Sequence, residues 1–508
     1  MATLLVNSNV NAYTIIAGLL VTATIYKIIK DSRTSLPPGP RGIPVLGNIF
    51  NTSPYRPLWV QFKEFGQYYG SDIICLKFFG TTVIIANSLK ATSELFVKRG
   101  TIYSNKPVLP LIKLVSFEWP FPMSQYNDET WKAGRKLFRQ EMEGNRSLLR
   151  PEEELASRKL LKRLLEAPEQ FHKLLRHMAG ELILSTTYGM DVLPENDPNI
   201  NRAEQVIKDI SDAFNPGLFL VSMLPILKRL PSIKRKTEEW KKLSYDLRDL
   251  PFEWLKKTVA DGTYRPSVGS RSLAELRDRG ETPDDMARLA DILGTMFAAG
   301  SDTTVSSLLS FFLVMAMNPE ILRKGQAAID SVTGGKRLPT FADRDDLPYV
   351  EAIAKEVLRW NPVGPIGSPH ATSQDDVYNG WMIPKGSIVI GNTWAILRDE
   401  NLYGPETDKF IPERFLNVDG SLNLTIPDTD VAFGYGRRAC PGKSMATDSI
   451  WITIALLLST FDIRAKKGQV FAKDGALYSQ ELISRPLPFE CIIEPRSDSA
   501  RALINESV

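Results

Sequence analysis

The sequence predicts a mainly α-helical fold with small β-sheets. Helical spacing of apolar residues dominates the middle of the chain, whereas short β-like runs occur at residues 72–86, 387–392 and 461–464. Proline and glycine occur throughout the chain, and no internal repeat or Ser/Gly-rich linker divides residues 48–508. We therefore expect one large domain, although the length alone would also allow about three.

The composition excludes several classes of protein. Of 508 residues, 43% are hydrophobic and 24% are charged, which is ordinary for a globular protein. The 62 basic and 59 acidic side chains nearly balance, so the basic excess of a typical nucleic-acid binder is missing. Three cysteines and three histidines are too few for a disulfide framework or a multi-residue zinc site. Any metal must therefore take most of its ligands from something other than the protein.

The N-terminus predicts a membrane anchor. Residues 2–26 contain no charged side chain, and Lys27, Lys30 and Arg33 follow at once. Because about 20 apolar residues span a bilayer, residues 1–30 are expected to form one transmembrane helix. A cleaved signal peptide is the alternative, but it would need a basic start and a small-residue cleavage site. The basic residues after the span favour a cytosolic location for the rest of the chain.

A basic and proline-rich hinge follows at residues 31–47. Its four prolines between positions 37 and 44 cannot share one helix, and they favour a stiff, extended spacer. The body of the protein is therefore expected to span residues 48–508, held at a set distance from the membrane.

A long apolar stretch predicts a buried central helix. Thr282 and Pro283, with two acids after them, form a typical helix start. The next proline is Pro319, so we expect one continuous helix roughly 50 Å long. Asp302 is the only charged residue between positions 292 and 317. A second transmembrane span is the rival interpretation, but this carboxylate and the neighbouring hydroxyls make the segment too polar for lipid.

The middle of this helix carries an unusual polar group. Residues 299–304 read AGSDTT, and most of these residue types are poor in helix interiors, at a combined cost of about 2 kcal/mol relative to alanine. Glycine lets a flat ligand or a gas molecule approach the backbone. The aspartate and the hydroxyl groups of this segment could relay protons within otherwise apolar surroundings. A helix kink with a capped Ser/Thr cluster is the structural alternative.

A glycine-rich motif near the C-terminus, FGYGRRACPGKS at residues 433–444, has three interpretations. Residues 434–439 fit a dinucleotide fingerprint, and Asp462 lies near the usual distance for a ribose-binding acid. However, a poor strand precedes the motif and no further β–α–β unit follows it. Residues 442–444 resemble a phosphate-binding loop, but Arg437 stands where that loop needs a glycine.

The third interpretation centres on Cys440. Pro441 and Gly442 open a helix that is expected to reach about Ser459. A cysteine at a helix N-terminus, with arginines nearby, should have a lowered pKa and exist as the thiolate. A nucleophilic cysteine would want a histidine partner. As the single axial ligand of a metal, the thiolate needs no other protein ligand, which fits the shortage of Cys and His.

The cysteine motif resembles the haem-binding loop of the cytochrome P450 family. The residues that match are Phe433, Gly436, Arg438, Cys440 and Gly442. Three further motifs occur in the family's order. Residues 299–304 resemble its oxygen-activating helix, residues 356–359 its ExxR pair, and residues 412–415 its PERF element. The resemblance covers nearly the whole chain, including the anchor and the hinge of membrane-bound microsomal members.

This resemblance implies a P450 fold for residues 48–508 and a haem b cofactor. The residues implied to bind the cofactor are Trp131, Arg135, His370, Phe433, Gly436, Arg438, Cys440 and Gly442, with the Cys440 thiolate as axial ligand of the iron. Glu356, Arg359 and Arg414 are expected to form a buried, charge-assisted network that holds the cysteine loop.

The implied activity is that of a haem-thiolate monooxygenase, which inserts one oxygen atom of O2 into a lipophilic small molecule. Asp302 and Thr303 are expected to relay protons, and Gly300 to leave room for dioxygen. Because neither dinucleotide motif withstands scrutiny, electrons are expected from NADPH through NADPH–cytochrome P450 reductase, with cytochrome b5 as a second candidate partner. The residues that form either a basic docking face or a solvated helix face are Lys132, Arg135, Lys136, Arg139 and Lys443.

Two segments, residues 369–387 and 484–496, look most like fungal family members of secondary metabolism. They favour a terpenoid, a polyketide or an alkaloid-like aromatic as substrate. Family position places residues 108–123, Phe297, 363–366 and 476–478 around the pocket, and residues 215–224 near the membrane. The implied location is the endoplasmic reticulum membrane, with a single span and the catalytic domain in the cytosol.

Two other function classes remain open on sequence grounds. An NAD(P)-binding oxidoreductase would bind nucleotide directly and contain no haem. A non-catalytic membrane haem protein would bind haem but would not turn over with a reductase.

Overall fold

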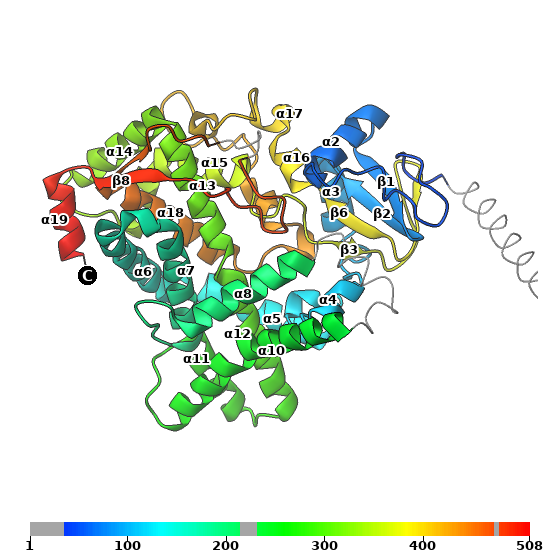
Figure 1. Ribbon diagram of the computed structural model, residues 1–508, viewed down its shortest axis with the longest axis horizontal. Helices are drawn as coiled ribbons and strands as arrows, with labels where there is room; N and C mark the ends of the chain where they lie inside the picture. Colours follow the sequence, from blue (N-terminus) through cyan, green and yellow to red (C-terminus); the bar gives the residue numbers. More distant parts are fainter. Residues whose placement is uncertain (1–34, 214–230, 472–476, 508) are drawn as a thin grey trace, which may run out of the picture.

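The computed structural model describes residues 35–213, 231–471 and 477–507, which form a large helical body and a smaller β-lobe (Figure 1). The predicted anchor at residues 1–30, part of the hinge and the segment 215–224 lie outside the described residues. The mainly helical prediction with small sheets is confirmed for the parts of the chain that are described.

Helices make up most of the body. The α-helices are α2 Leu58–Tyr69, α3 Leu89–Thr92, α4 Pro110–Leu114, α5 Glu129–Phe138, α6 Arg146–Glu166, α7 Phe171–Tyr188, α8 Pro198–Ala213, α10 Pro231–Ala260, α11 Val268–Asp278, α12 Pro283–Gly300, α13 Thr303–Met317, α14 Pro319–Thr333, α15 Pro348–Trp360, α16 Thr393–Leu397, α17 Glu400–Tyr403, α18 Lys443–Thr460 and α19 Asp498–Glu506. The shorter 3-10 and π turns are η1 Ser93–Lys98, η2 Phe121–Met123, η3 Arg139–Gly144, η4 Pro168–Gln170, η6 Phe341–Asp346, η7 Pro412–Phe415, η8 Thr429–Phe433 and η9 Gly436–Arg438.

The strands form three small sheets. They are β1 Ile73–Phe78, β2 Thr81–Ala86, β3 His370–Ala371, β4 Asp376–Tyr378, β5 Trp381–Ile383, β6 Ile388–Gly391, β7 Phe461–Ala465 and β8 Cys491–Pro495. The largest sheet has the order β1-β2-β6-β3, and its parallel pair is β2 with β6. The three β-like runs of the sequence fall on β1–β2, β6 and β7. This sheet lacks the repeated β–α–β units of a dinucleotide-binding domain.

The main hydrophobic core surrounds α13 and α18. Both helices are buried over most of their length, and they pack with α6, α7 and α15 into one apolar cluster. A helix that is apolar on all sides is stable in water only when other elements cover it. The helix that follows the cysteine motif is therefore buried in the main hydrophobic core.

The predicted central helix is buried, but it is not continuous. It is interrupted between the end of α12 at Gly300 and the start of α13 at Thr303. The Thr303 hydroxyl donates to the carbonyl oxygen of Ala299 at 3.0 Å, and the Ser301 hydroxyl donates to Ala298 at 3.2 Å. Such hydroxyl-to-backbone bonds compete with helical ones, so the expectation of an unbroken helix was wrong and a local kink replaces it.

Helices α12 and α13 together, Pro283–Met317, are long and apolar enough to cross a membrane, judged by length and composition alone. In the protein, however, 78% of their most apolar window is buried against other elements. That burial agrees with a core helix, as the polar residues in its middle predict.

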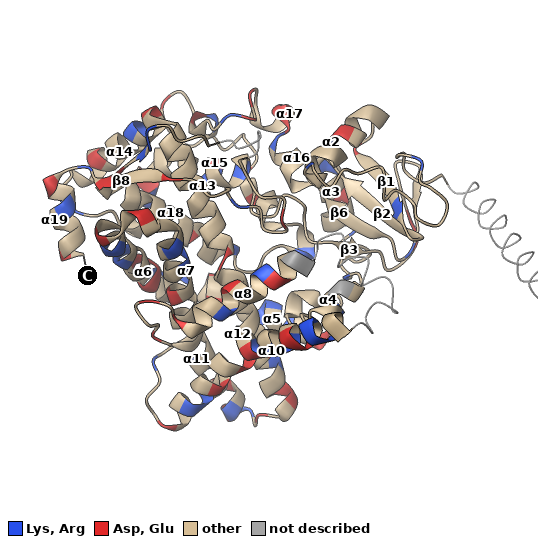
Figure 2. Ribbon diagram, viewed as in Figure 1, with Lys and Arg blue, Asp and Glu red and all other residues tan. Residues whose placement is uncertain are grey.

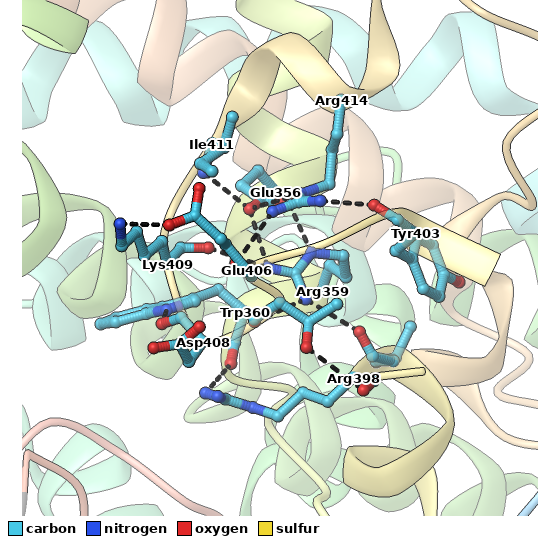
Figure 3. Close-up of polar contacts among 12 residues, drawn as sticks. Glu356, Arg359, Trp360, Arg398, Tyr403, Glu406, Asp408, Lys409, Ile411 and Arg414 are labelled. Atoms are coloured by element: carbon cyan, nitrogen blue, oxygen red, sulfur yellow. Dashed lines mark hydrogen bonds and ion pairs between the residues drawn. The ribbon is translucent and has the colours of Figure 1, made fainter. Parts of the chain in front are cut away.

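A buried charge network ties α15 to the chain between α16 and η7 (Figure 3). Arg359 donates to both carboxylate oxygens of Glu356 at 2.6 and 2.8 Å, and both side chains are fully buried. Arg414 donates to Glu356 at 3.1 Å. The remaining donors of Arg359 reach the carbonyl oxygens of Leu397, at 2.8 Å, and Thr407, at 3.0 Å. The carboxylate therefore neutralises a guanidinium that in turn fixes the irregular backbone after α16.

The Glu356→Gln variant tests this network. Glutamine would leave the guanidinium groups of Arg359 and Arg414 without their carboxylate, so we expect the free energy of unfolding to fall by about 3–5 kcal/mol. Urea unfolding followed by circular dichroism measures this loss. The control is Glu494→Gln, because Glu494 pairs with Arg464 on the surface with both side chains more than half exposed. That variant should change the stability by less than about 1 kcal/mol; equal losses in both variants would contradict the network's role.

Candidate functional site

The cysteine loop lies between η8 and α18 and is closed by its own backbone. The amide of Cys440 donates to the carbonyl oxygen of Phe433 at 2.6 Å. Gly436 has a φ of +52°, and a Cβ atom there would lie 2.1 Å from the carbonyl oxygen of Phe96. Glycine is therefore required at this position by both conformation and space. By contrast, a Cβ at Gly442 would meet the Cys440 sulfur at an ordinary 4.0 Å.

The thiol of Cys440 precedes the first turn of α18, as predicted. Burial raises the pKa of this thiol, while a backbone hydrogen bond with Gly442 and the charge of Arg135 lower it. The expected net lowering by the protein alone is therefore wrong, because desolvation outweighs the helix terminus and the arginine. Protein atoms surround the thiol, yet the residue keeps exposed surface. A metal ion would deprotonate a coordinating thiol outright.

Helix α5 packs against the cysteine loop through two of the predicted residues. Arg135 donates to the carbonyl oxygen of Ala439 at 2.5 Å. The guanidinium of Arg438 lies over the ring of Trp131, 5.1 Å from its centre. The structure thus brings Trp131, Arg135 and Arg438 together beside Cys440.

A cluster of buried cationic groups adjoins this loop. Arg438 donates to the carbonyl oxygens of Ser104 and Ser124, each at 2.8 Å, and its Nη1 is buried without a partner. Lys106 is buried and donates to the hydroxyl of Ser368 at 2.7 Å. The sequence interpretation overlooked this lysine, because a lone Lys in YSNKP carries no pattern that distinguishes it from a surface residue.

His370 belongs to the same cluster. Its Nδ1 lies 2.6 Å from the carbonyl oxygen of Tyr103 and must donate, since a carbonyl can only accept. Burial and the charge of Lys106 lower the pKa of His370 to about 3. Burial and the charge of Arg438 lower the pKa of Lys106 to about 7. The strongest electrostatic neighbours of these two groups are therefore cations, not carboxylates.

These residues fit a bound haem. Buried charges are normally paired. Lys106 and Arg438 are held only by neutral carbonyl and hydroxyl groups, the neutral His370 ring adds an N–H donor, and one buried guanidinium nitrogen has no partner, so these donors suit an anionic group such as a haem propionate. Within the described residues, no cluster of three or more His, Cys, Asp or Glu could hold a metal ion. A porphyrin supplies four nitrogens, so a single protein thiol completes that donor set from one side.

The predicted relay residues lie at the break between α12 and α13. Asp302 is buried, and Arg485 donates to its Oδ2 at 3.1 Å. Burial raises the pKa of Asp302, and the charge of Arg485 opposes that rise. Thr303 is half-buried, with its hydroxyl on the carbonyl oxygen of Ala299. The sequence analysis used the segment containing Arg485 as a family likeness and missed this contact, because the two residues lie far apart in the chain.

Gly300 has a packing reason of its own. A Cβ atom at this position would lie 2.7 Å from the side chain of Ile183 on α7. The close approach of two helices thus explains the glycine, and its role in admitting dioxygen stays a prediction.

The two groups of residues are linked by one apolar cluster. It contains Phe138 of α5 and Phe297 of α12, and Met445 of α18 packs against it. Trp119 and Phe121, from the segment expected around the pocket, are buried in the same cluster. The Trp119 indole donates to the hydroxyl of Ser244 at 2.9 Å. One apolar cluster therefore contains side chains of α5 and α12 and contacts Met445 of α18.

The network of Glu356, Arg359 and Arg414 is separate from these groups. It holds the backbone after α16 directly, whereas the cysteine loop is bound by its own amides and by Arg135. Helix α15 does pack beside η8, the turn that leads into the loop. The network and the loop are therefore neighbours through α15 and η8, and a role of the network in holding the loop stays a prediction.

Comparison with known proteins agrees with the geometry. The family model described as Cytochrome P450 matches residues 37–490. The cytochrome P450 monooxygenase eriA of Hericium erinaceus is 37% identical, and the match covers 97% of this chain and 94% of the relative. Cytochrome P450 monooxygenase 98 of Postia placenta is 38% identical, with 99% of each chain covered. The match spans the cysteine loop, the buried cations and the central helices, and the chain therefore belongs to the cytochrome P450 family, the haem-thiolate monooxygenases that contain haem b and draw electrons from NADPH through a reductase.

Proposed function

We propose that this monooxygenase holds its haem through Cys440 and the buried cations, and oxidises a lipophilic secondary metabolite. The observation that carries the proposal is the group formed by buried Lys106, the neutral ring of buried His370 and half-buried Arg438, whose Nη1 has no partner, beside a single cysteine. When bound, a haem with a thiolate ligand supplies the activation of O2 and the oxidation itself. The protein's part is to bind, to orient and to manage protons.

Each predicted cofactor residue has a distinct task in this proposal. Cys440 would ligate the iron, and Arg438, Arg135, His370 and Lys106 would hold the anionic groups of the haem. The remaining predicted residues shape the loop and cover it: Trp131 stacks on Arg438, the Phe433 carbonyl accepts from the Cys440 amide, Gly436 allows the turn and Gly442 is the N-cap of α18.

Proton transfer is assigned to Asp302 and Thr303. Burial raises the pKa of the Asp302 carboxyl above its ordinary value, and a carboxyl with a raised pKa is better suited to give and take up protons. The Thr303 hydroxyl is on the next residue and can both donate and accept. Together they would pass protons from the protein to the oxygen-binding side.

The redox partner is proposed to dock near α5. Lys132, Lys136 and Arg139 are exposed on α5 and η3, whose inner side holds the cysteine loop through Arg135 (Figure 2). Lys443 is also near the loop but pairs with Asp430, and Lys132 pairs with Glu129 at 2.9 Å. NADPH–cytochrome P450 reductase, and cytochrome b5 as a second donor, are the acidic partners proposed for this face.

The membrane assignment is part of the same proposal. Residues 1–30 are proposed as a single-pass anchor, residues 31–47 as a hinge and residues 48–508 as the cytosolic haem domain, at the endoplasmic reticulum. Val45, Phe50 and Tyr55, next to the hinge, are at least 75% exposed, which suits a position close to a lipid surface. Segment 215–224 is proposed as a second contact.

The substrate is proposed to be a terpenoid, a polyketide or an alkaloid-like aromatic. The apolar cluster of α5, α10 and α12 contains several aromatic side chains, and such surroundings favour lipophilic ligands over charged ones.

Replacing the axial ligand tests the core of the proposal. Reduced wild-type holoenzyme should give the thiolate-type Soret band in its carbon monoxide difference spectrum, and Cys440→Ser should lose it, because a serine oxygen cannot replace the thiolate. Cys491→Ser, on β8, is the matched control and should keep the band. A wild-type spectrum without this band would refute the proposed haem site.

The proton relay is tested by Thr303→Ala. Loss of the hydroxyl should lower the product formed per NADPH by a factor of about 10 or more and increase hydrogen peroxide, as when a positioned acid–base group is lost. Product, peroxide and NADPH are measured together with an accepted substrate. Thr304→Ala is the control and should stay within about twofold of wild type. Unchanged coupling in Thr303→Ala would contradict the relay.

Docking through charge predicts a dependence on salt. The first electron transfer from the reductase, followed by stopped flow, should slow as ionic strength rises, because screening weakens attraction between exposed charges. The double variant Lys132→Gln/Lys136→Gln should be slower at low salt and less sensitive to salt. Lys241→Gln/Lys242→Gln on α10 is the control and should follow wild type. A flat profile for wild type would exclude electrostatic docking.

A further inference from the structure

We propose that Arg485 is a positioning residue of the proton relay, which holds the Asp302 carboxylate in place and sets when it carries a proton. The inference rests on the proposed role of Asp302. It assigns a task to the C-terminal loop, Ser479–Arg485, that is separate from any contact this loop makes with substrate.

The contact between the two side chains is a two-pronged ion pair. Arg485 donates from Nη2 to Oδ2 of Asp302 at 3.1 Å and from Nη1 to Oδ1 at 3.4 Å. The Asp302 side chain is 8% exposed and that of Arg485 is 21% exposed, so water screens the pair weakly. A bidentate guanidinium, which donates to both carboxylate oxygens, fixes the plane of the carboxylate as well as its position.

At the position of Asp302 in the backbone, the ion pair with Arg485 takes the place of a helix-capping hydrogen bond. Asp302 is the N-cap residue of α13, where an aspartate usually accepts from an amide of the first turn. Here the side chain makes no capping hydrogen bond. Its oxygens face Arg485 instead, so the ion pair determines the direction of the carboxylate.

The loop that carries Arg485 is itself fixed to the central helix. The hydroxyl of Ser306 on α13 donates to the carbonyl oxygen of Ser484 at 2.6 Å, and the Ser484 amide donates to Val363 at 2.9 Å. The Asn361 side chain donates to the Ser484 hydroxyl at 3.3 Å. Arg485 is thus tied to the same helix as Asp302 through its neighbouring residue, and a shift of the loop would move the guanidinium relative to the carboxylate.

Three other charged groups act on this pair. Glu481, on the same loop, lies 3.6 Å from Nε of Arg485. Arg176 on α7 lowers the pKa of Asp302 and Glu204 on α8 raises it, and these two side chains pair with each other. Because their effects oppose one another, Arg485 is the dominant charge for Asp302.

Loss of Arg485 should therefore have a defined pH signature. Burial raises the pKa of Asp302 above its ordinary value, and Arg485 is the first influence that opposes this rise. Without Arg485, the carboxyl stays protonated to a higher pH. A buried acid with a raised pKa binds more protons in the folded state than in the unfolded state. The protonated carboxyl therefore adds to the free energy of unfolding at low pH, and this contribution is lost as the pH rises toward the folded-state pKa.

Thermal unfolding of the holoenzyme across about pH 4–8 tests this signature. The Tm of Arg485→Gln should fall below that of wild type by a gap that widens by about 2 °C or more as pH rises. In the Asp302→Asn background, adding Arg485→Gln should no longer produce a gap that widens with pH. Arg485→Lys keeps a positive charge, so it should restore part of the wild-type pH dependence. Arg464→Gln, which breaks a surface ion pair, should give no widening gap. A gap that is constant with pH, or independent of Asp302, would mean that Arg485 is merely structural and would overturn the proposal.

Coupling measurements then separate this inference from the proposed function. Arg485→Gln should give at least about twofold less product per NADPH near neutral pH, with recovery at higher pH where the carboxyl ionises. If Asp302→Asn leaves coupling unchanged, the relay of the proposed function is refuted. If Asp302→Asn uncouples the enzyme but Arg485→Gln follows the wild-type pH profile, the relay stands and the role of Arg485 is refuted.

Discussion

The site depends on positive charge held inside the protein without protein carboxylates against it. Lys106 and Arg438 are held by backbone carbonyl oxygens and one hydroxyl, which offer partial charges but no net negative charge, and the neutral ring of His370 donates to a further carbonyl oxygen. The carbonyl groups come from residues 103–104, 124 and 369, so these separate stretches of chain converge beside the cysteine loop. In the proposed function, these donors bind the anionic edge of the cofactor.

The protein uses the opposite arrangement where it needs rigidity. Glu356 lies between two guanidinium groups, and the remaining donors of Arg359 are taken up by backbone carbonyls. This network is complete within the chain, and it therefore has no capacity left for a ligand. The contrast separates a structural charge cluster from a binding one: the first satisfies its donors internally, whereas the second leaves Nη1 of Arg438 unpartnered.

Sequence patterns predicted the parts of the site that depend on local geometry. Each of these features, the turn at Gly436, the helix after Cys440 and the pair of Glu356 with Arg359, is formed by residues close together in the chain, so short motifs that resemble the family's identify them. Lys106 was missed because its meaning comes from burial beside residues far away in the chain. The kink in the central helix was considered only as the alternative to an unbroken helix, because no proline interrupts the segment; hydroxyl groups that bond to the backbone also produce a kink.

Two of the buried carboxyl groups, Glu356 and Asp302, differ in how completely their oxygens are occupied. Glu356 has two guanidinium partners and accepts from the backbone amide of Ile411. Asp302 has one guanidinium partner, at longer distances, and that partner is itself attracted to Glu481. Burial outweighs the charge of this single cation and raises the pKa of Asp302. Because Arg485 is the first influence that opposes the rise, a shift of the loop that carries Arg485 would change how readily the carboxyl gives up its proton.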